Sequence, residues 1–356
     1  RSRKASGPYG RCFHYRQHLV CLLSGLAFSL PAWREDQRSY LGSCGKGMIL
    51  EEEFKTAKKK KTLENCSKIS YKYLYLRIIE ILFSKYQYIM NYLLILLAVS
   101  MAVSGLGWIY FIYFFSIGYG FGISALAVTM AILFKDVITL PTALLCVVMF
   151  IFGCRLGLYL LTREKRSPEY KKILYGPDAA KKKPLFVVIT VWVFCALLYV
   201  GQVSPVAFFL ANKASGAPVN EVWAWIGACL MAAGVVLESV ADAQKKAAKK
   251  INKHRFVDTG VYRLVRCPNY LGELVIWTGS FIVCFGACCA VWQWIIAAIG
   301  YIGIVYVMFS GARRLEIRQN GAYGKDPEYQ AYIKKTPILL PFVPIYSVEK
   351  HKWLQA

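Results

Sequence analysis

Two long stretches of this 356-residue chain contain no charged residue at all. The first covers residues 86–134 and the second residues 274–312, and each is long enough for two membrane spans of about 20 residues. Such a lack of charge, with 57% hydrophobic and 15% aromatic residues, excludes an ordinary water-soluble domain. Each stretch therefore predicts a helical hairpin in a membrane.

Three further apolar stretches, residues 137–161, 185–211 and 219–241, are also long enough to span. Two others are not counted, because residues 18–33 are too few and residues 69–89 are interrupted by charges. The sequence therefore predicts an all-α, polytopic membrane protein with about seven transmembrane helices.

Acidic residues are scarce, since the chain has 44 Lys and Arg but only 20 Asp and Glu. The formal net charge is therefore +24. The basic residues flank the spans, which favours membrane orientation over a nucleic-acid partner. With seven spans, residues 163–183, residues 245–266 and the tail after residue 313 lie on one side, which the positive-inside rule makes cytoplasmic. We expect a multi-pass protein of a bacterial inner membrane, or of the endoplasmic reticulum in a eukaryote, with a cytoplasmic C-terminus and no protein partner.

Residues 1–89 differ from the rest, with 17 basic and 7 acidic residues and no clear periodicity. Seven spans would place this basic segment outside, against the positive-inside rule. We expect it to be disordered or a gene-model extension, followed by a domain at residues 90–345 that starts at Met90 and a short tail at 346–356. The alternative is a basic arm that lies on anionic lipid. Native peptides from before Met90, found by mass spectrometry, would contradict the extension.

Cysteine and histidine show no metal-ligand or disulfide spacing, so no metal site is predicted. The glycines of S-I-G-Y-G-F-G at 116–122 lack the strand context of a dinucleotide loop. Together with Gly153 and Gly157 they favour close helix packing. Arg155, near the end of the third span, either snorkels to the headgroups, which we slightly prefer, or pairs with an acid on a neighbouring helix.

Charged residues gather where the fifth span ends. Glu238 and Asp242 are four residues apart and share a helix face, which Lys246 and Lys249 continue. A carboxylate followed by ammonium groups suits a nucleotide, because the first accepts from ribose or amide groups and the second meet phosphates. A solvated helix end, with lysines favoured by the helix dipole, is the alternative for about half of these residues.

The segment 256–273 is dense in polar groups between two apolar stretches. Tyr262, Arg263 and Arg266 predict a basic aromatic strip, and Asn269 is a natural N-cap for the next helix. Capping does not explain Glu273, since a carboxylate deep in hydrocarbon costs about 2.5 to 3.5 kcal/mol. We therefore expect Glu273 to have a partner or a function.

A short helix is predicted after the last span, over residues 326–335. Asp326 is followed by Pro327, a residue favoured at the first helical position. Tyr329 and Tyr332 share one face of this helix and are expected to anchor it at the membrane interface.

Three blocks, taken together and in this order, resemble the steroid 5-alpha-reductase-like family over about residues 90–345. They read E-S-V-A-D-A-Q-K at 238–245, G-V-Y-R-L-V-R-C-P-N-Y-L-G-E at 260–273 and Y-G-K-D-P-E-Y-Q-A-Y-I-K-K-T-P-I-L-L-P at 323–341. The stretch G-C-R-L-G-L-Y-L-L-T-R-E at 153–164 is similar to the bacterial branch. Single blocks also occur in the isoprenylcysteine carboxyl methyltransferases of the same superfamily.

The resemblance implies an integral membrane reductase that holds NADPH in a cytoplasm-facing cavity. Its reaction would reduce a carbon–carbon double bond conjugated to a carbonyl in a steroid or other lipophilic substrate. Glu273 and Tyr270 are the expected catalytic residues. The expected cofactor-binding residues are Asp242, Lys246, Lys249, Arg263, Arg266, Asn269, Arg313, Arg314 and Glu316.

One position departs from the family pattern. Relatives commonly read Arg-His-Pro where this chain has Arg266, Cys267 and Pro268, and a thiol is a weaker hydrogen-bond donor than an imidazole. Two alternatives to the reductase function stay open. This departure weakens the first of them, an S-adenosylmethionine-dependent methyltransferase of a lipid or prenylated substrate. The second alternative is a non-catalytic lipid-binding membrane protein.

Overall fold

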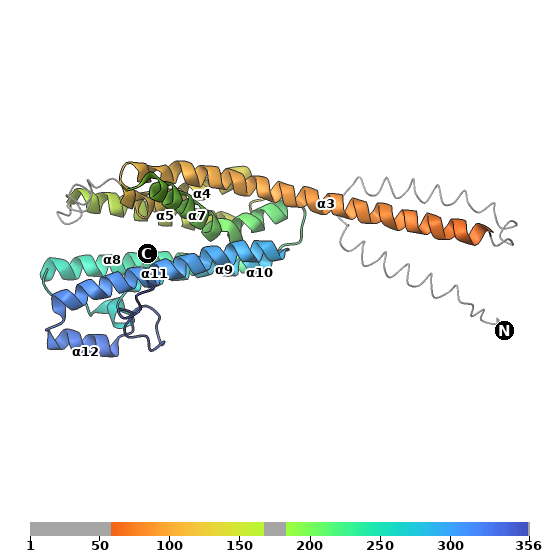
Figure 1. The fold of residues 1–356 in the computed structure, drawn as a ribbon. Helices are drawn as coiled ribbons and strands as arrows, with labels where there is room; N and C mark the ends of the chain where they lie inside the picture. The colour runs from red at the N-terminus through yellow and green to blue at the C-terminus, as the bar shows by residue number, and fades with distance from the viewer. Residues whose placement is uncertain (1–57, 167–182, 355–356) are drawn as a thin grey trace, which may run out of the picture. The chain divides into compact units, whose positions relative to one another are not determined.

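The computed structural model describes residues 58–166 and 183–354, and within these ranges the chain is helical and has no strand (Figure 1). The chain divides into two units between Phe83 and Ser84. Helix α3 begins at Lys58, so part of the basic N-terminal segment is helical, while residues 1–57 lie outside the described residues. The predicted division at Met90 stays a prediction. All of the candidate site residues belong to the second unit, Ser84–Ala356.

Seven helices among the described residues are long and apolar enough to cross a membrane, which confirms the predicted architecture. Several helices extend beyond the predicted apolar stretches, since α3 begins before residue 86 and α11 ends eleven residues after residue 312. Helix α8 continues ten residues beyond residue 241 because alanine and lysine there are good helix formers. The helices are α3 (Lys58–Ser104), α4 (Ile117–Leu133), α5 (Leu140–Arg166), α7 (Leu185–Ala214), α8 (Glu221–Ile251), α9 (Pro268–Ile282) with the short α10 (Cys284–Ala287), and α11 (Val291–Tyr323).

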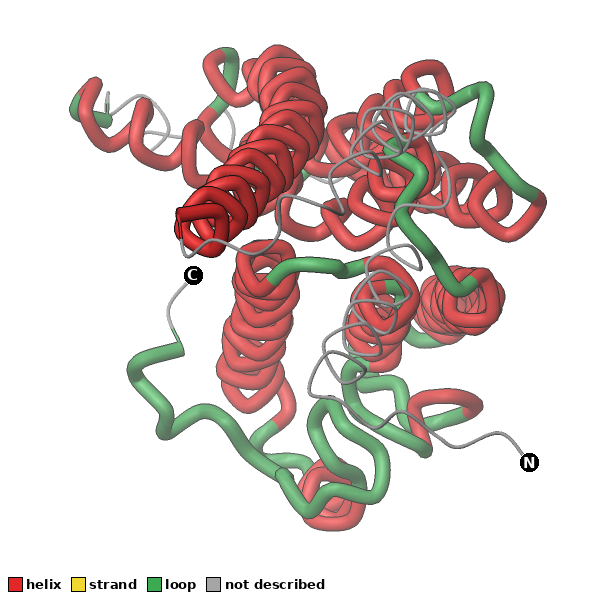
Figure 2. The backbone as a smooth tube through the Cα atoms, turned by 90° about the vertical axis from the view of Figure 1, so that its right-hand side faces the viewer, coloured by secondary structure: helices red, strands yellow, loops and turns green. Residues whose placement is uncertain are grey.

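Short helical pieces complete the order. Two 3-10 turns, η2 (Gly105–Trp108) and η3 (Phe111–Phe114), join α3 to α4. A third turn, η4 (Gly260–Arg263), precedes α9, and α12 (Pro327–Lys335) follows α11. The view along several of the helices in Figure 2 shows how they pack side by side as a bundle.

Glycine pairs bring the helices together, as predicted for the glycines of α4 and α5. A Cβ atom placed on Gly120 would lie 2.7 Å from the backbone nitrogen of Gly157. The same holds between α8 and α9, where a Cβ on Gly234 would lie 2.6 Å from the Gly272 carbonyl oxygen. Small residues let helices approach closely, and this closeness fixes which side chains become neighbours across an interface.

The core helix of the bundle is α7, whose residues from Tyr199 to Asn212 are all buried. Pro205 lies inside this stretch and cannot donate a backbone hydrogen bond. The Ser204 hydroxyl donates to the Gly201 carbonyl oxygen at 2.8 Å, which satisfies a backbone group beside the proline.

The start of α9 corrects one prediction. Its N-cap is Cys267, whose side chain makes no capping bond, and Asn269 is already the second helical residue. The reason is Pro268, because the fixed φ of proline suits the first position of a helix and moves the boundary back. Asn269 is therefore not the N-cap.

The predicted helix after α11 is confirmed as α12, with the Asp326 carboxylate accepting from the Glu328 backbone nitrogen at 2.9 Å. Its two tyrosines contact the protein, and their expected role as anchors at a membrane interface stays a prediction. The Tyr329 hydroxyl donates to Asn320 Oδ1 at 2.8 Å, and the Tyr332 hydroxyl donates to the Tyr262 carbonyl oxygen at 2.8 Å. Both rings also pack on Phe256, so they dock α12 onto the protein.

Candidate active site

Glu273 has a hydrogen-bond partner inside the bundle, as its burial predicted. It lies on α9, is 6% exposed, and accepts from the Tyr119 hydroxyl of α4 at 2.6 Å. The Tyr119 oxygen in turn accepts from Trp277 Nε1 at 2.8 Å. Trp277 lies one turn after Glu273, so both reach Tyr119 from the same face of α9.

Aromatic rings enclose this group of three, here called the Tyr119 cluster (Tyr119, Glu273 and Trp277). The Tyr119 ring lies 5.1 Å from that of Tyr199, measured between centroids, and the Phe152 ring lies 5.9 Å from that of Trp277. Tyr199 is held in place because its hydroxyl donates to a backbone carbonyl. Such apolar surroundings strengthen the hydrogen bonds of the cluster and fix their direction.

Arg155 of α5 pairs with two acids of α8. Its Nη2 lies 2.7 Å from Glu238 Oε1, and its Nη1 lies 3.0 Å from Asp242 Oδ2. The shared face of Glu238 and Asp242 is thus confirmed, and pairing rather than snorkelling describes Arg155. Two buried atoms of this group, Arg155 Nε and Glu238 Oε2, make no hydrogen bond.

The Arg155 group and the Tyr119 cluster are adjacent because α8 and α9 touch. A Cβ atom placed on Gly272 would lie 2.8 Å from the Glu238 backbone nitrogen. The carboxyl groups of Glu238 and Glu273 consequently interact electrostatically. Polar groups from α4, α5, α8 and α9 therefore form one connected site inside the bundle.

Tyr270 lies one turn before Glu273, between α9 and α11. Its ring is half-buried and would lie 3.3 Å from a Cβ atom on Gly311. The charged groups that act on Tyr270 include Arg314 and Arg318 of α11. Lys245 of α8 also interacts with Arg318. Lys245, Arg314 and Arg318 are here called the basic cluster, in which Arg314 and Arg318 lie near Tyr270 and Lys245 lies near Arg318.

Lys245 and Arg318 are not among the site residues predicted from the sequence. A signal for Arg318 was present, because it follows Arg314 by four residues and therefore shares its helix face. Tyr119 was missed for a different reason. The glycines around it predicted close helix packing, and the structure confirms that packing. This prediction gave no role to the tyrosine between the glycines.

Arg266 and Glu316 form a buried ion pair that holds the C-terminal segment. Arg266 Nη2 lies 2.8 Å from Glu316 Oε1 and also donates to the Tyr346 carbonyl oxygen. Glu316 Oε2 accepts from the Val348 backbone nitrogen at 2.8 Å, and Arg313 Nε donates to a carbonyl of the same segment. Arg266 Nε and Nη1 are buried and make no hydrogen bond.

The remaining candidate residues lie outside these contacts. Lys249 Nζ donates to the carbonyl oxygens of Lys253 and Arg255 at 3.1 and 2.5 Å, and so closes the end of α8. Asn269 is half-buried, while Arg263 is exposed and Arg266 is 2% exposed, so the predicted basic aromatic strip is not one surface. The exposed candidates are Lys246, Arg263 and Arg314.

Cys267, at the position where the motif departs from the family, is fully buried. Burial raises the pKa of its thiol to about 12, so the group is neutral at physiological pH. Nearby, the Tyr262 hydroxyl donates to the Ala241 carbonyl oxygen at 3.2 Å, and burial raises its pKa as well. Both groups are neutral, and Cys267 lies beside the Arg266–Glu316 pair.

The site has cations that could contact a phosphate group. Among the described residues, no group of three or more His, Cys, Asp or Glu side chains could hold a metal ion. The basic cluster has three cations, and Arg266 has two buried nitrogen atoms, Nε and Nη1, without a hydrogen-bond partner. Unpaired guanidinium groups of this kind suit phosphate oxygens.

Comparison with known proteins identifies a family for this chain. A family profile described as a protein of unknown function (DUF1295) matches residues 114–336, which is more than half of the chain and contains Tyr119, Arg155 and Glu273. No curated protein and no solved structure matches. The chain therefore belongs to the DUF1295 family, which is the steroid 5-alpha-reductase-like family.

Proposed function

We propose that this protein is a membrane-embedded, NADPH-dependent reductase of a carbon–carbon double bond conjugated to a carbonyl, acting on a steroid or another lipophilic substrate. The observation that carries the proposal is the hydrogen-bonded pair of Tyr119 and Glu273, enclosed by aromatic rings in a bundle of membrane-spanning helices. Family membership supports it, because the family is steroid 5-alpha-reductase-like.

Reduction of such a substrate needs a proton donor at the carbonyl oxygen, where negative charge develops as the double bond is attacked. Bound NADPH would supply the hydride that reaches the β-carbon. Tyr119 is the donor that we assign to the carbonyl oxygen, since its hydroxyl is oriented by two hydrogen bonds. A fixed donor of this kind is a general acid and an oxyanion stabiliser at once.

Glu273 controls which way the Tyr119 proton points. When Glu273 is ionised, it accepts the Tyr119 proton, as the 2.6 Å contact allows. When Glu273 carries a proton, it donates to the Tyr119 oxygen instead, and the Tyr119 proton becomes available to substrate. Trp277 Nε1 donates to the Tyr119 oxygen and would stabilise negative charge left there after proton transfer.

The basic cluster and Arg266 are the groups that we assign to the cofactor phosphates. Lys245 and Arg318 add to the candidates from the motif blocks, which already include Arg314, and Tyr270 lies one turn before Glu273 on α9. Roles in cofactor binding for Asp242, Lys246, Lys249, Arg263, Asn269, Arg313 and Glu316 stay predictions.

The motif blocks also support a placement within the superfamily. We propose that the chain belongs to the bacterial branch, that it shares ancestry with the isoprenylcysteine carboxyl methyltransferases, and that it resides in the inner membrane. A methyltransferase activity has weaker support, since a buried neutral Cys267 stands where those enzymes commonly carry histidine.

Cofactor binding tests the proposal directly. Purified protein in nanodiscs is expected to bind NADPH and to oxidise it in the presence of 3-oxo-4-ene steroids or other lipophilic enones. Binding of S-adenosylmethionine without binding of NADPH would replace the reductase by the methyltransferase. Binding of neither cofactor would favour a lipid-binding protein.

Two substitutions test the assignment of Tyr119 and Glu273. Tyr119→Phe and Glu273→Gln are each expected to lower the rate of NADPH oxidation by about 100-fold, the typical contribution of a general acid, while NADPH still binds. The matched controls are Tyr92→Phe and Glu221→Gln, whose contacts lie with Tyr88 and Lys213, and both should keep full activity. Full activity of the Tyr119→Phe variant would remove Tyr119 from the mechanism.

A further inference from the structure

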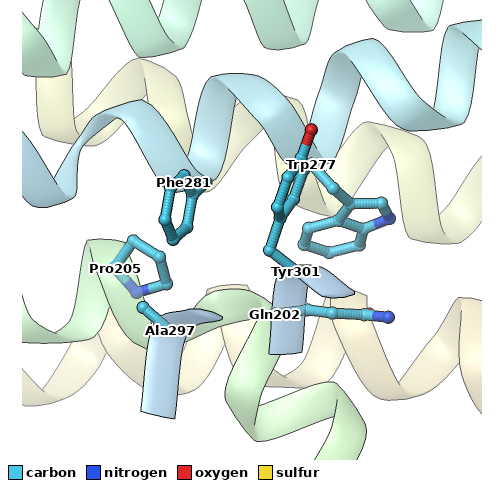
Figure 3. Close-up of a pocket in the computed structure, with 6 residues that line it drawn as sticks. All are labelled: Gln202, Pro205, Trp277, Phe281, Ala297 and Tyr301. Carbon is cyan, nitrogen blue, oxygen red and sulfur yellow. The ribbon is translucent and has the colours of Figure 1, made fainter. Parts of the chain in front are cut away.

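The interior gap that the structure shows between α7, α9 and α11 does not hold a ligand. Gln202, Trp277 and Tyr301 are among the side chains that line it (Figure 3), and it does not admit even a water molecule. A feature that the proposed function leaves unexplained lies on the surface instead. It belongs to the C-terminal segment, defined here as residues 337–354, which follows α12.

The C-terminal segment leaves large apolar and aromatic side chains exposed. Phe342 is 94% exposed and Trp353 is 68% exposed, and Val343 and Tyr346 are exposed as well. The segment is nevertheless docked on the protein, because Leu354 at its end is buried in the core of the bundle. Exposed apolar side chains that gather in one docked segment indicate a surface that meets protein or lipid.

The end of this segment runs back along α11 toward the membrane. The Val348 backbone nitrogen donates to Glu316 Oε2 at 2.8 Å, and the Trp353 carbonyl oxygen accepts from the Tyr306 hydroxyl at 2.9 Å. The contact on α11 thus moves back by ten residues, a rise of about 15 Å along the helix. In Figure 1 the dark blue chain after α12 accordingly returns to the side of α11.

Tyr306 lies within the membrane-spanning part of α11. A span of about 20 residues that begins at Val291 ends near residue 310. The Trp353 ring stacks on the Tyr306 ring, with the two centroids 6.2 Å apart. Trp353 therefore lies at the level where hydrocarbon meets headgroups, and this is the level at which tryptophan and tyrosine are enriched in membrane proteins.

Phe342 belongs to a loop that begins at the same level. The loop starts where the Cys267 backbone nitrogen donates to the Ile338 carbonyl oxygen at 3.0 Å, immediately before the span of α9. It closes where the Ile338 nitrogen donates to the Ile345 carbonyl oxygen at 2.9 Å. Phe342 has a φ of +63°, which is costly for a bulky side chain, and such strain is retained mainly at functional positions. The strained backbone here presents an almost fully exposed phenyl ring.

Basic side chains accompany the aromatic ones. Lys350 and Lys352 are exposed and shortly precede Trp353 in the chain. Glu349, the acid next to them, faces the protein instead, where its Oε2 accepts from Asn320 Nδ2 at 2.7 Å. The exposed charge of this stretch is therefore positive, and lysines beside a membrane surface attract anionic phospholipids.

We propose that the C-terminal segment is an interfacial membrane anchor. Phe342 and Trp353 insert at the boundary between headgroups and acyl chains, in the leaflet on the C-terminal side, while Lys350 and Lys352 contact the phosphates of anionic phospholipids. Lipid is the partner that the position selects, because both aromatic residues lie in chain that is bound at the level where α9 and α11 leave the membrane. The segment is then held by lipid on one side and by the protein on the other.

Photocrosslinking at the two aromatic positions identifies what covers them. Benzoylphenylalanine replaces Phe342 or Trp353 in the full chain, in nanodiscs of phosphatidylglycerol and phosphatidylcholine, and the adducts are identified by mass spectrometry. Lipid adducts are expected at both positions and are expected to be absent at the control position, Lys325, which is exposed between α11 and α12. Adducts to residues 1–57 or to a second copy of the chain, or lipid adducts missing from either aromatic position, would overturn the proposal.

Hydrogen exchange of the protein without the crosslinker tests the lysines. In peptides that cover residues 343–354, exchange is expected to be slower in nanodiscs with phosphatidylglycerol than in phosphatidylcholine alone, by about fivefold for each lysine. Lys350→Gln with Lys352→Gln should remove the difference. Lys250→Gln with Lys253→Gln is the charge-matched control, exposed around the far end of α8, and should keep it.

Equal exchange in the two lipids, or a difference that survives in the Lys350 and Lys352 variant, would show that these lysines do not contact anionic lipid. Neither measurement requires cofactor or turnover. Failure of the anchor is therefore distinct from failure of the reductase proposal.

Discussion

At the scale of single residues, Arg155 has the largest predicted effect on stability. It is the cation that both Glu238 and Asp242 contact, and the Glu238 side chain is only 6% exposed. Removing one partner of a buried ion pair leaves an uncompensated charge. We expect Arg155→Met to lower the free energy of unfolding by about 3 kcal/mol.

Denaturation of the purified variants in mixed micelles measures this effect. The double variant Arg155→Met with Glu238→Gln should recover most of the loss, because the remaining buried group is neutral. Arg314→Met is the control, since Arg314 is exposed. If the single and double variants are equally unstable, the charge argument is wrong and Arg155 stabilises by packing alone.

Cys267 gives a residue-scale prediction that depends on pH. With a pKa raised to about 12, about one thiol in ten thousand is a thiolate at pH 8, and only the thiolate reacts. We expect no maleimide labelling of Cys267 in the folded protein at pH 8 and labelling after denaturation, read by mass spectrometry of the peptide. An added cysteine at the exposed position, Arg263→Cys, should label in both states. Fast labelling of native Cys267 would contradict its burial.

Single residues also show which contacts can be predicted from the sequence and which cannot. The need of Glu273 for a partner follows from the cost of a carboxylate in hydrocarbon and requires no structure. The partner itself is 154 residues away, and no spacing in the sequence indicates Tyr119. The same holds for Arg266, whose second contact is a backbone carbonyl of the C-terminal segment.

At the scale of elements, the helices could be predicted because each has to satisfy its own backbone inside the membrane. The apolar pattern does not indicate which helices contact one another. The contacts of α8 with α9 depend on glycine pairs, and these decide that Glu238 and Glu273 are neighbours. Glycine spacing suggests that a close interface exists, without naming its partner helix.

The α8–α9 interface is tested by one substitution. In Gly234→Val the new Cβ would lie 2.6 Å from the Gly272 carbonyl oxygen, so the two helices have to separate. We expect a loss of about 1 to 3 kcal/mol in the free energy of unfolding. The same substitution should also weaken activity, because it displaces Glu273 from Tyr119.

Gly321→Ala provides the matched control for this interface. No heavy atom lies within 4 Å of a Cβ placed there, and the residue lies inside α11. Alanine in a helix is favoured over glycine by roughly 0.5 to 1 kcal/mol, so this variant should be as stable as the wild type or more so. A Gly234→Val protein of unchanged stability would mean that α8 and α9 do not pack closely.

At the scale of the whole molecule, the orientation in the membrane decides on which side of the membrane the basic cluster lies. The positive-inside rule predicts the segments 163–183 and 245–266 and the C-terminal tail on the cytoplasmic side. The loop between α7 and α8 is then predicted on the opposite side. Pro218 in that loop and Lys350 in the tail are both exposed.

Labelling of intact cells with a membrane-impermeant thiol reagent checks this orientation. In a background without other reactive cysteines, Pro218→Cys is expected to be labelled from outside, and Lys350→Cys only after the cells are opened. The reversed pattern would place the basic segments outside and remove the cytoplasmic supply of NADPH from the proposed function.

The sequence by itself determined the number of spans and their approximate ends, the helix after the last span, and the family resemblance, since each rests on local composition and motifs. The tertiary structure alone decided that Tyr119 meets Glu273, that Arg155 meets Glu238 and Asp242, and that Arg266, Arg313 and Glu316 hold the C-terminal segment. The physical reason is that a membrane imposes apolarity and backbone pairing on every span alike. Which polar side chains meet depends on the packing of spans far apart in the chain.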